Sequence, residues 1–142
     1  MPENKMPPSQ KLIDKIAWLH LHEGKLLSTR SRGKDRYYIP GGKRETGETD
    51  EQTLLREIRE ELTVELLVES IVYRGTFEAP AHGHAPDVQV RMTCYGARYT
   101  GTIQPAAEIE EVIWLTYRHR PQVSAVDQLI FDWLKYQQLL AE

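Results

Sequence analysis

The chain has 142 residues, 40% of them hydrophobic, which is enough for the core of one compact domain. Its 18 lysines and arginines nearly balance 21 aspartates and glutamates, giving a net charge of −3. This balance argues against a protein that binds nucleic acid or an anionic membrane, because such proteins carry a basic stripe or patch. The single cysteine, Cys94, cannot form an internal disulfide, and the first ten residues contain no apolar stretch for a signal peptide or membrane span. We therefore predict a cytoplasmic protein that acts on small molecules.

The N-terminal part of the chain predicts an arm followed by a hairpin. Residues 1–10 are polar and proline-containing, so we expect a flexible arm ahead of one folded domain over residues 11–142. Residues 15–22 alternate between apolar and polar side chains, and a Glu-Gly turn separates them from residues 25–29. This pattern predicts a β-hairpin. A basic loop follows, and it either holds phosphate groups or is a solvated surface loop. Its cations are Arg30, Arg32, Lys34 and Arg36.

A glycine loop and a helix come next. Pro40-Gly41-Gly42 ends any preceding strand, and glycines let the backbone approach a ligand closely. Thr49 and Gln52 have the spacing of a capping box, which predicts a helix over residues 50–62. The helix has an apolar stripe formed by Leu54, Leu55, Ile58 and Leu62.

The C-terminal half predicts further strands and one more helix. Residues 65–77, 88–99 and 112–117 are rich in β-forming residues and predict strands. His82 and His84, between the first two, are weak zinc candidates because no third soft ligand is near them in sequence. A last helix is expected to begin at Ser124 and Asp127 and to bury Val126, Leu129, Ile130, Trp133 and Leu134. This order of elements predicts an α+β fold with a mixed sheet between helices.

Three glutamates of the first predicted helix form an acidic strip. Glu57, Glu60 and Glu61 share one helix face, because residues three and four positions apart are neighbours on a helix. Like charges at this spacing destabilise a helix by about 0.2–0.5 kcal/mol per pair. Mg²⁺ or Mn²⁺ would offset the repulsion, because hard cations prefer carboxylate oxygens. Arg56 and Arg59 could also offset it, and the strip could simply be a solvated face.

Residues 42–64 resemble the signature of the Nudix family, G-x5-E-x7-R-E-U-x-E-E-x-G-U, in which U is aliphatic. The matching positions are Gly42, Glu48, Arg56, Glu57, Ile58, Glu60, Glu61 and Val64. The departure is Thr63, where the family has the glycine that follows the helix. A β-branched residue resists the left-handed conformation, so we expect this helix to end differently from the family pattern, with some strain.

The resemblance implies a Nudix fold and a Mg²⁺- or Mn²⁺-dependent hydrolase that cleaves a phosphoanhydride bond. It implies that Glu57, Glu60 and Glu61 bind metal, and that the backbone of Gly41 and Gly42 helps to line the metal site. Arg56 would orient the glutamates through an ion pair.

The resemblance also bears on the general base and on a further acidic residue. Either Glu57 or a loop glutamate would act as the base, and Glu48 would support the loop. In related nucleotide pyrophosphohydrolases a loop glutamate precedes a strand tryptophan, and Glu108 lies six residues before Trp114. Glu110 and Glu111 are rivals for this role, and all three could merely solvate a loop.

The substrate is less well determined by the sequence. A nucleobase needs an aromatic or apolar slot with a few polar groups. Candidate binding residues, each of which could equally be an ordinary strand or loop residue, are Arg30, Arg36, Tyr37, Tyr38, Phe77 and Arg91.

Three functions remain open from the sequence. The plain domain resembles the MutT-like branch, which hydrolyses nucleoside triphosphates to monophosphate and pyrophosphate. Pro80 resembles a proline of the ADP-ribose-cleaving branch, which leaves a pyrophosphatase acting on another nucleoside diphosphate derivative as the alternative. A non-catalytic nucleotide-binding regulatory domain is the third possibility. A domain this small with an exposed aromatic edge could also form a homodimer.

Overall fold

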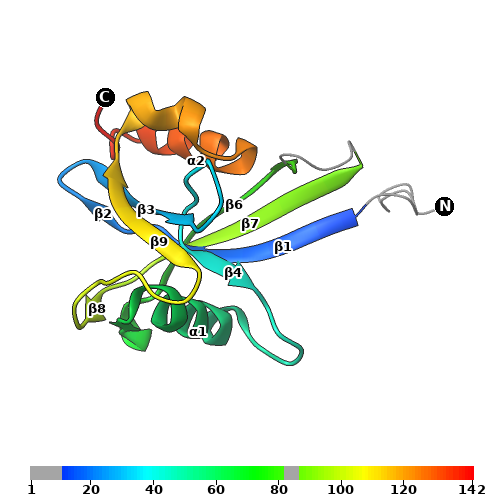
Figure 1. The fold of residues 1–142 in the computed structure, drawn as a ribbon, viewed down its shortest axis with the longest axis vertical. Coiled ribbons are helices and arrows are strands. Elements are labelled where there is room, and N and C mark those ends of the chain that lie inside the picture. The colour runs from blue at the N-terminus through cyan, green and yellow to red at the C-terminus, as the bar shows by residue number, and fades with distance from the viewer. Residues whose placement is uncertain (1–10, 82–86) are drawn as a thin grey trace.

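A computed structural model describes residues 11–81 and 87–142. Its strands form a central layer, with α1 (Asp50–Leu62) on one side and α2 (Ala125–Tyr136) on the other (Figure 1). The predicted α+β architecture, a mixed sheet between helices, is confirmed. The arm over residues 1–10 and the candidate zinc ligands His82 and His84 lie outside the described residues. Within the described ranges, no helix is both long enough and apolar enough to cross a membrane.

The larger sheet positions the glycine loop. It has the order β4 (Gly41–Lys43), β1 (Lys11–Trp18), β7 (Val88–Gly96), β6 (Val72–Pro80). β1 and β7 run parallel, whereas the outer pairs are antiparallel. The register of β1 with β4 sets Ile16 opposite Gly42, so the glycine loop lies directly beside β1.

Two smaller sheets complete the strand layer. One has the order β2 (Leu21–His22), β3 (Lys25–Ser31), β9 (Ile109–Leu115), and all of its pairs are antiparallel. The other pairs β5 (Glu65–Leu66) with β8 (Tyr99–Thr100). β9 begins three residues before the strand predicted over 112–117, and it therefore starts next to Glu108.

The hairpin predicted over residues 15–29 is wrong in its first strand. β1 ends at Trp18 and pairs with β4 and β7, so both of its hydrogen-bonding edges are used and only Leu21–His22 pairs with β3. The chain passes between the sheets at Leu19 and His20. There the Leu19 N–H donates to the Tyr95 carbonyl (2.8 Å) and the His20 carbonyl accepts from Leu27 N–H (3.0 Å).

The single strand predicted over residues 65–77 is also wrong. β5, the short 3₁₀ helix η1 (Val68–Ser70) and β6 replace it, and the strand predicted over 88–99 breaks between β7 and β8. The high β-propensity of valine misled the prediction, because that propensity reflects packing on a half-buried sheet surface. Val68, in η1, is 51% exposed and lacks such packing.

Helix α1 begins and ends at the predicted residues. The Thr49 hydroxyl accepts from Gln52 N–H (3.1 Å), and the Gln52 side chain accepts from Thr49 N–H (3.0 Å), which completes the capping box. The expectation that Thr63 would end the helix differently is wrong. Thr63 itself adopts the left-handed conformation (φ 62°, ψ 25°) despite its branched side chain, and its hydroxyl donates to the Thr102 carbonyl (3.1 Å).

The sheet layer separates two cores, because successive strand residues point to opposite faces. On the α1 side, Ile16, Trp18 and Leu27 pack against the apolar stripe of the helix, in which Leu54, Ile58 and Leu62 are buried. On the α2 side, Leu19, Leu26, Met92 and Cys94 pack against Ile130, Phe131 and Leu134. Helix α2 is capped by Ser124 as predicted, but Leu129 is exposed rather than buried, so its apolar face is narrower than predicted.

Candidate active site

A cleft of about 330 Å³ lies where α1, β1, β4 and the start of β9 meet. Three of the predicted acidic residues line it: Glu57 and Glu61 from α1, and Glu108 from the loop before β9. Gly41 and Gly42 form part of its wall. The tertiary structure thus brings the glycine loop, the helix and a segment about 50 residues downstream to one place.

The two glycines are required by close contacts with these carboxylates. A Cβ at Gly42 would lie 2.3 Å from the Glu57 carboxyl carbon, so no larger residue fits without moving that side chain. Gly41 has a φ of 148°, and a Cβ there would lie 2.0 Å from the Ile16 carbonyl oxygen. The Gly41 N–H donates to Glu61 Oε1 (3.2 Å). The glycine loop therefore fixes the positions of both helix carboxylates.

Arg56 connects the loop to the helix. Its guanidinium donates to both oxygens of Glu48 (2.7 and 2.9 Å), to Glu57 Oε2 (3.0 Å) and to the Lys43 carbonyl (3.0 Å). The pKa of Glu48 is lowered to about 2, first by the hydrogen bond from Arg56 and then by the backbone N–H of Glu45. This geometry agrees with a positioning role for Arg56 and a supporting role for Glu48. Glu60 is 54% exposed at its side chain, contacts Arg56 at 3.5 Å, and lies outside the lining of the cleft.

The cleft is electrostatically suited to a cation. Glu61 is only 6% exposed, and its pKa is raised to about 8, first by burial and then by the nearby charge of Glu57. Burial also raises the pKa of Glu57, and the hydrogen bond from Arg56 opposes that effect. Within residues 11–81 and 87–142, no three His, Cys, Asp or Glu side chains are gathered closely enough to hold a metal by themselves. Mg²⁺ commonly takes one or two carboxylates and completes its ligands with water and substrate phosphates, so these residues fit such an ion.

The structure separates Glu108 from its two rivals. Arg30 Nε donates to Glu111 Oε1 (3.0 Å), and Arg30 Nη1 lies 3.6 Å from Glu110 Oε1. The Tyr37 hydroxyl also donates to Glu111 (3.3 Å). Glu108 instead faces the cleft, and its carbonyl accepts from the Arg32 N–H (2.9 Å). Of the three loop glutamates, Glu108 is therefore the one placed to act with Glu57 and Glu61.

Comparisons with known proteins agree with this geometry. The sequence profile of the NUDIX domain matches residues 13–134. The chain belongs to the Nudix family. Membership makes it a Nudix pyrophosphohydrolase, the class of enzyme that acts on small nucleotide substrates. A search of curated proteins finds none that matches this sequence.

Solved structures similar to this Nudix domain include several MutT proteins. The ORF135 protein of E. coli is 22% identical, with a TM-score of 0.71, over 93% of this chain and 94% of that one. A MutT protein from Methanosarcina mazei Go1 is 15% identical, with a TM-score of 0.73, over 93% and 99%. A MutT NUDIX hydrolase from Burkholderia pseudomallei is 19% identical, with a TM-score of 0.68, over 86% and 96%. At these identities the similarity shows the fold.

The predicted substrate-binding residues are spread over the Nudix domain. Tyr38 borders the cleft, whereas the others contact different groups. Arg30 pairs with the loop glutamates, and Arg36 donates to the carbonyls of residues 121 and 123 (3.1 and 3.3 Å). Phe77 packs against Trp133 with ring centroids 5.7 Å apart, and Arg91 pairs with Glu78 (2.7 Å). Of the six candidates, the structure brings Tyr38 to the cleft.

A second hollow of about 270 Å³ adjoins the cleft and shares Lys15, Ser31 and Tyr38 with it. Its wall is largely apolar, and it also contains Lys34 and Ser124. The apolar wall consists of Ile13, Ala81, Val90, Met92 and Val126. Sequence reasoning missed Lys15 and Ser124 as site residues: Lys15 is one polar residue in an alternating strand, and Ser124 has the pattern of a helix cap. Their place beside the cleft depends on the β1–β7 pairing and on the docking of α2.

Proposed function

We propose that this Nudix hydrolase uses Mg²⁺ or Mn²⁺ to cleave a nucleoside triphosphate, ribo- or deoxyribo-, with water, giving the nucleoside monophosphate and pyrophosphate. The observation that supports it is the convergence of Glu57, Glu61 and Glu108 on one cleft that opens into an apolar-walled hollow. A nucleoside triphosphate needs these two environments side by side. The acidic cleft attracts the cations that bind its phosphates, and the apolar hollow can cover its flat base.

Each side chain of the cleft has a distinct role in this proposal. Glu57 and Glu61 would hold the metal together with the backbone of Gly41 and Gly42, with Glu60 at the edge of the set. A bound divalent ion would shield the phosphate charge and help orient the attacking water. Arg56 positions Glu57, and the Gly41 N–H positions Glu61.

We assign the general base to Glu108 rather than to Glu57. Glu57 already accepts a hydrogen bond from Arg56 (3.0 Å) and is one of the proposed metal ligands, so both roles occupy its carboxylate oxygens. The Glu108 carboxylate has no hydrogen bond or ion pair within the described residues, so it can accept a proton from water. Lys15, on the wall shared by both hollows, would pair with a substrate phosphate.

The adjoining hollow would hold the nucleoside. Tyr38 and the apolar side chains of its wall can cover the faces of a base, because aromatic and aliphatic groups bury large areas with few polar demands. Ser31 and Ser124 supply hydroxyl groups that can donate to or accept from base edges. This placement leaves Arg91 and Phe77 outside the proposed nucleoside site.

Product analysis tests the proposal. The purified chain is incubated with nucleoside triphosphates, ADP-ribose and dinucleotides, with Mg²⁺ or with a chelator. Pyrophosphate formed from triphosphates only with the metal is the expected result. If ADP-ribose yields two monophosphates instead, the protein is a pyrophosphatase that acts on nucleoside diphosphate derivatives. Saturable nucleotide binding without turnover would indicate a regulatory domain.

Matched variants on one helix sharpen that experiment. Glu61→Gln should serve as the inactive blank, and Glu51→Gln, at an exposed position in the first turn of α1, should keep full activity. Glu60→Gln should lose less activity than Glu57→Gln, because Glu60 lies outside the cleft lining. Equal losses for Glu57 and Glu60 would place both in the same ligand set.

A further inference from the structure

A third and larger hollow, of about 740 Å³, shares no lining residue with the proposed active site. It is bounded by Leu19–Leu21 between the sheets, by the turn around η1, by β6 and β7, and by the end of α2. Its size falls within the range of small-molecule sites. Nothing in the proposed hydrolysis uses it, so its chemistry can be considered independently.

The charge of this pocket is one-sided. Arg74 and Arg98 line it, and none of its lining residues is an aspartate or glutamate. Other arginines of the chain, such as Arg59, Arg91 and Arg120, pair with carboxylates at 2.5–2.8 Å. Within residues 11–81 and 87–142, the guanidinium groups of Arg74 and Arg98 have no such partner and no hydrogen bond. Ten N–H donors of two permanently charged groups therefore remain available to a ligand.

Backbone contacts set the positions of Arg74 and Arg98 at the pocket wall. A Cβ at Gly96 would lie 3.0 Å from Arg74 Nε, so the glycine lets the Arg74 side chain lie close against β7. The Arg98 N–H donates to Ser70 Oγ (2.8 Å), and its carbonyl accepts from Leu67 N–H (2.8 Å). The Ser70 hydroxyl in turn donates to the Leu67 carbonyl (2.6 Å). Arg98 is thus attached to η1 at both of its backbone polar groups.

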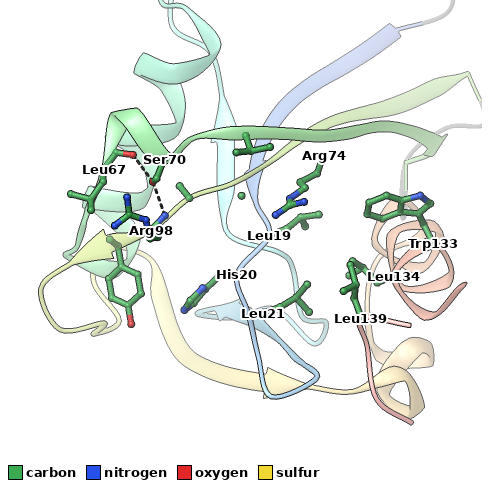
Figure 2. Close-up of a pocket in the computed structure, with 14 residues that line it drawn as sticks. Leu19, His20, Leu21, Leu67, Ser70, Arg74, Arg98, Trp133, Leu134 and Leu139 are labelled. Atoms are coloured by element: carbon green, nitrogen blue, oxygen red, sulfur yellow. Dashed lines mark hydrogen bonds between the residues drawn. The ribbon is translucent and has the colours of Figure 1, made fainter. Parts of the chain in front are cut away.

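The pocket has a polar end and an apolar end. Figure 2 shows Arg98 and Ser70 at one end and Trp133, Leu134 and Leu139 at the other, with Arg74 between them. Leu19 and Leu21 extend the apolar part, and Leu139 is 44% exposed there. The guanidinium of an arginine binds phosphate through charge-assisted hydrogen bonds, and an indole with leucines covers a flat apolar group. A ligand that satisfies both ends has an anionic head and an apolar body.

We propose that this pocket is a second ligand site, separate from the hydrolytic cleft, for a small organic phosphate with an aromatic body. The phosphate pairs with Arg74 and Arg98, and the aromatic group lies against Trp133 and the leucines. Charge complementarity selects an anion, and the apolar end selects one that carries a hydrophobic group rather than a free inorganic anion. The site needs no metal, which distinguishes it from the carboxylate cleft.

The test uses the full chain with a chelator, so that the acidic cleft does not attract phosphates through a metal. The probes are 1-naphthyl phosphate, neutral 1-naphthol and inorganic phosphate, measured by calorimetry. We expect 1-naphthyl phosphate to bind at least about tenfold more tightly than either fragment, because only it uses both ends of the pocket. No binding of it, or equal binding of a fragment, would overturn the proposal.

Variants and mapping locate the site. The double variant Arg74→Gln with Arg98→Gln should weaken binding about tenfold or more, and Arg74→Lys should retain part of the affinity that Arg74→Gln loses. Arg118→Gln, at an exposed position outside the pocket, should have no effect. Equal loss in Arg118→Gln would show unspecific charge attraction and refute the site. In the wild-type protein, binding should shift the NMR signals of the Gly96 and Arg98 backbone amides and of the Trp133 indole N–H. Shifts confined to Gly41 and Gly42 would refute the site without help from any variant.

Discussion

Replacing Gly42 by alanine should separate catalysis from folding. The Gly42 backbone lies outside the left-handed region, so alanine fits its conformation, but the new Cβ would stand 2.3 Å from the Glu57 carboxyl carbon. The carboxylate must retreat by about 1 Å to reach an ordinary contact of 3.4–4 Å, and it can do so because it ends a flexible side chain. A misplacement of about 1 Å can cost on the order of 100-fold in rate. The free energy of unfolding should change by less than about 1 kcal/mol, because an alanine at a compatible position slightly stabilises a chain.

Urea unfolding and the metal-dependent kcat/KM measure these two effects on the same preparation. Two neighbouring glycines serve as controls. Gly41→Ala should destabilise the fold strongly, because its Cβ would meet the Ile16 carbonyl at 2.0 Å and backbone cannot move aside as a side chain can. Gly47→Ala has open space around it and a φ of 86°, so it should cost about 1 kcal/mol of stability and leave activity intact. Full activity of a folded Gly42→Ala protein would refute the role of Glu57 in the cleft.

Three further changes have definite expected outcomes. Glu61→Gln should lower metal-dependent turnover at least about 100-fold, and full turnover would remove Glu61 from the site. The melting temperature should stay equal or rise, because the amide still accepts from Gly41 N–H and cannot ionise in its buried position. Thr63→Gly should raise the free energy of unfolding by up to about 1 kcal/mol, since glycine tolerates φ 62° and only an exposed hydrogen bond to Thr102 is lost. A lower free energy of unfolding in urea would contradict backbone strain at Thr63. Burial raises the pKa of Asp127 to about 7. Because the unfolded chain loses this proton near pH 4, Asp127 lowers stability as the pH rises from about 4 to about 7, by up to about 1.4 kcal/mol per pH unit. Asp127→Asn should therefore flatten this loss between pH 4 and pH 7, and equal slopes for the two proteins would refute it.

Local sequence patterns determined the two helices and the acidic strip. The Thr49–Gln52 capping box placed the start of α1, the apolar stripe that finishes at Leu62 placed its end, and the Ser124 cap placed the start of α2. These features depend on groups three or four residues apart, whose interactions are present in the primary pattern. The ion pair of Arg56 with Glu57, at 3.0 Å, was implied by the family resemblance and not by helical spacing, because side chains at adjacent helix positions do not face each other.

Only the tertiary structure decided which strands pair and which side chains meet. Alternation in residues 15–22 indicates a strand but not its partners, and β1 pairs with β4 and β7 instead of with β3. The choice of Glu108 over Glu110 and Glu111 likewise depends on Arg30, about 80 residues away, which pairs with both rivals. Hydrogen-bonding edges, packing faces and counter-charges contributed by distant segments are not encoded in any local pattern. They place Glu57 and Glu61 at a cleft and leave Glu60 on the solvated side of the strip.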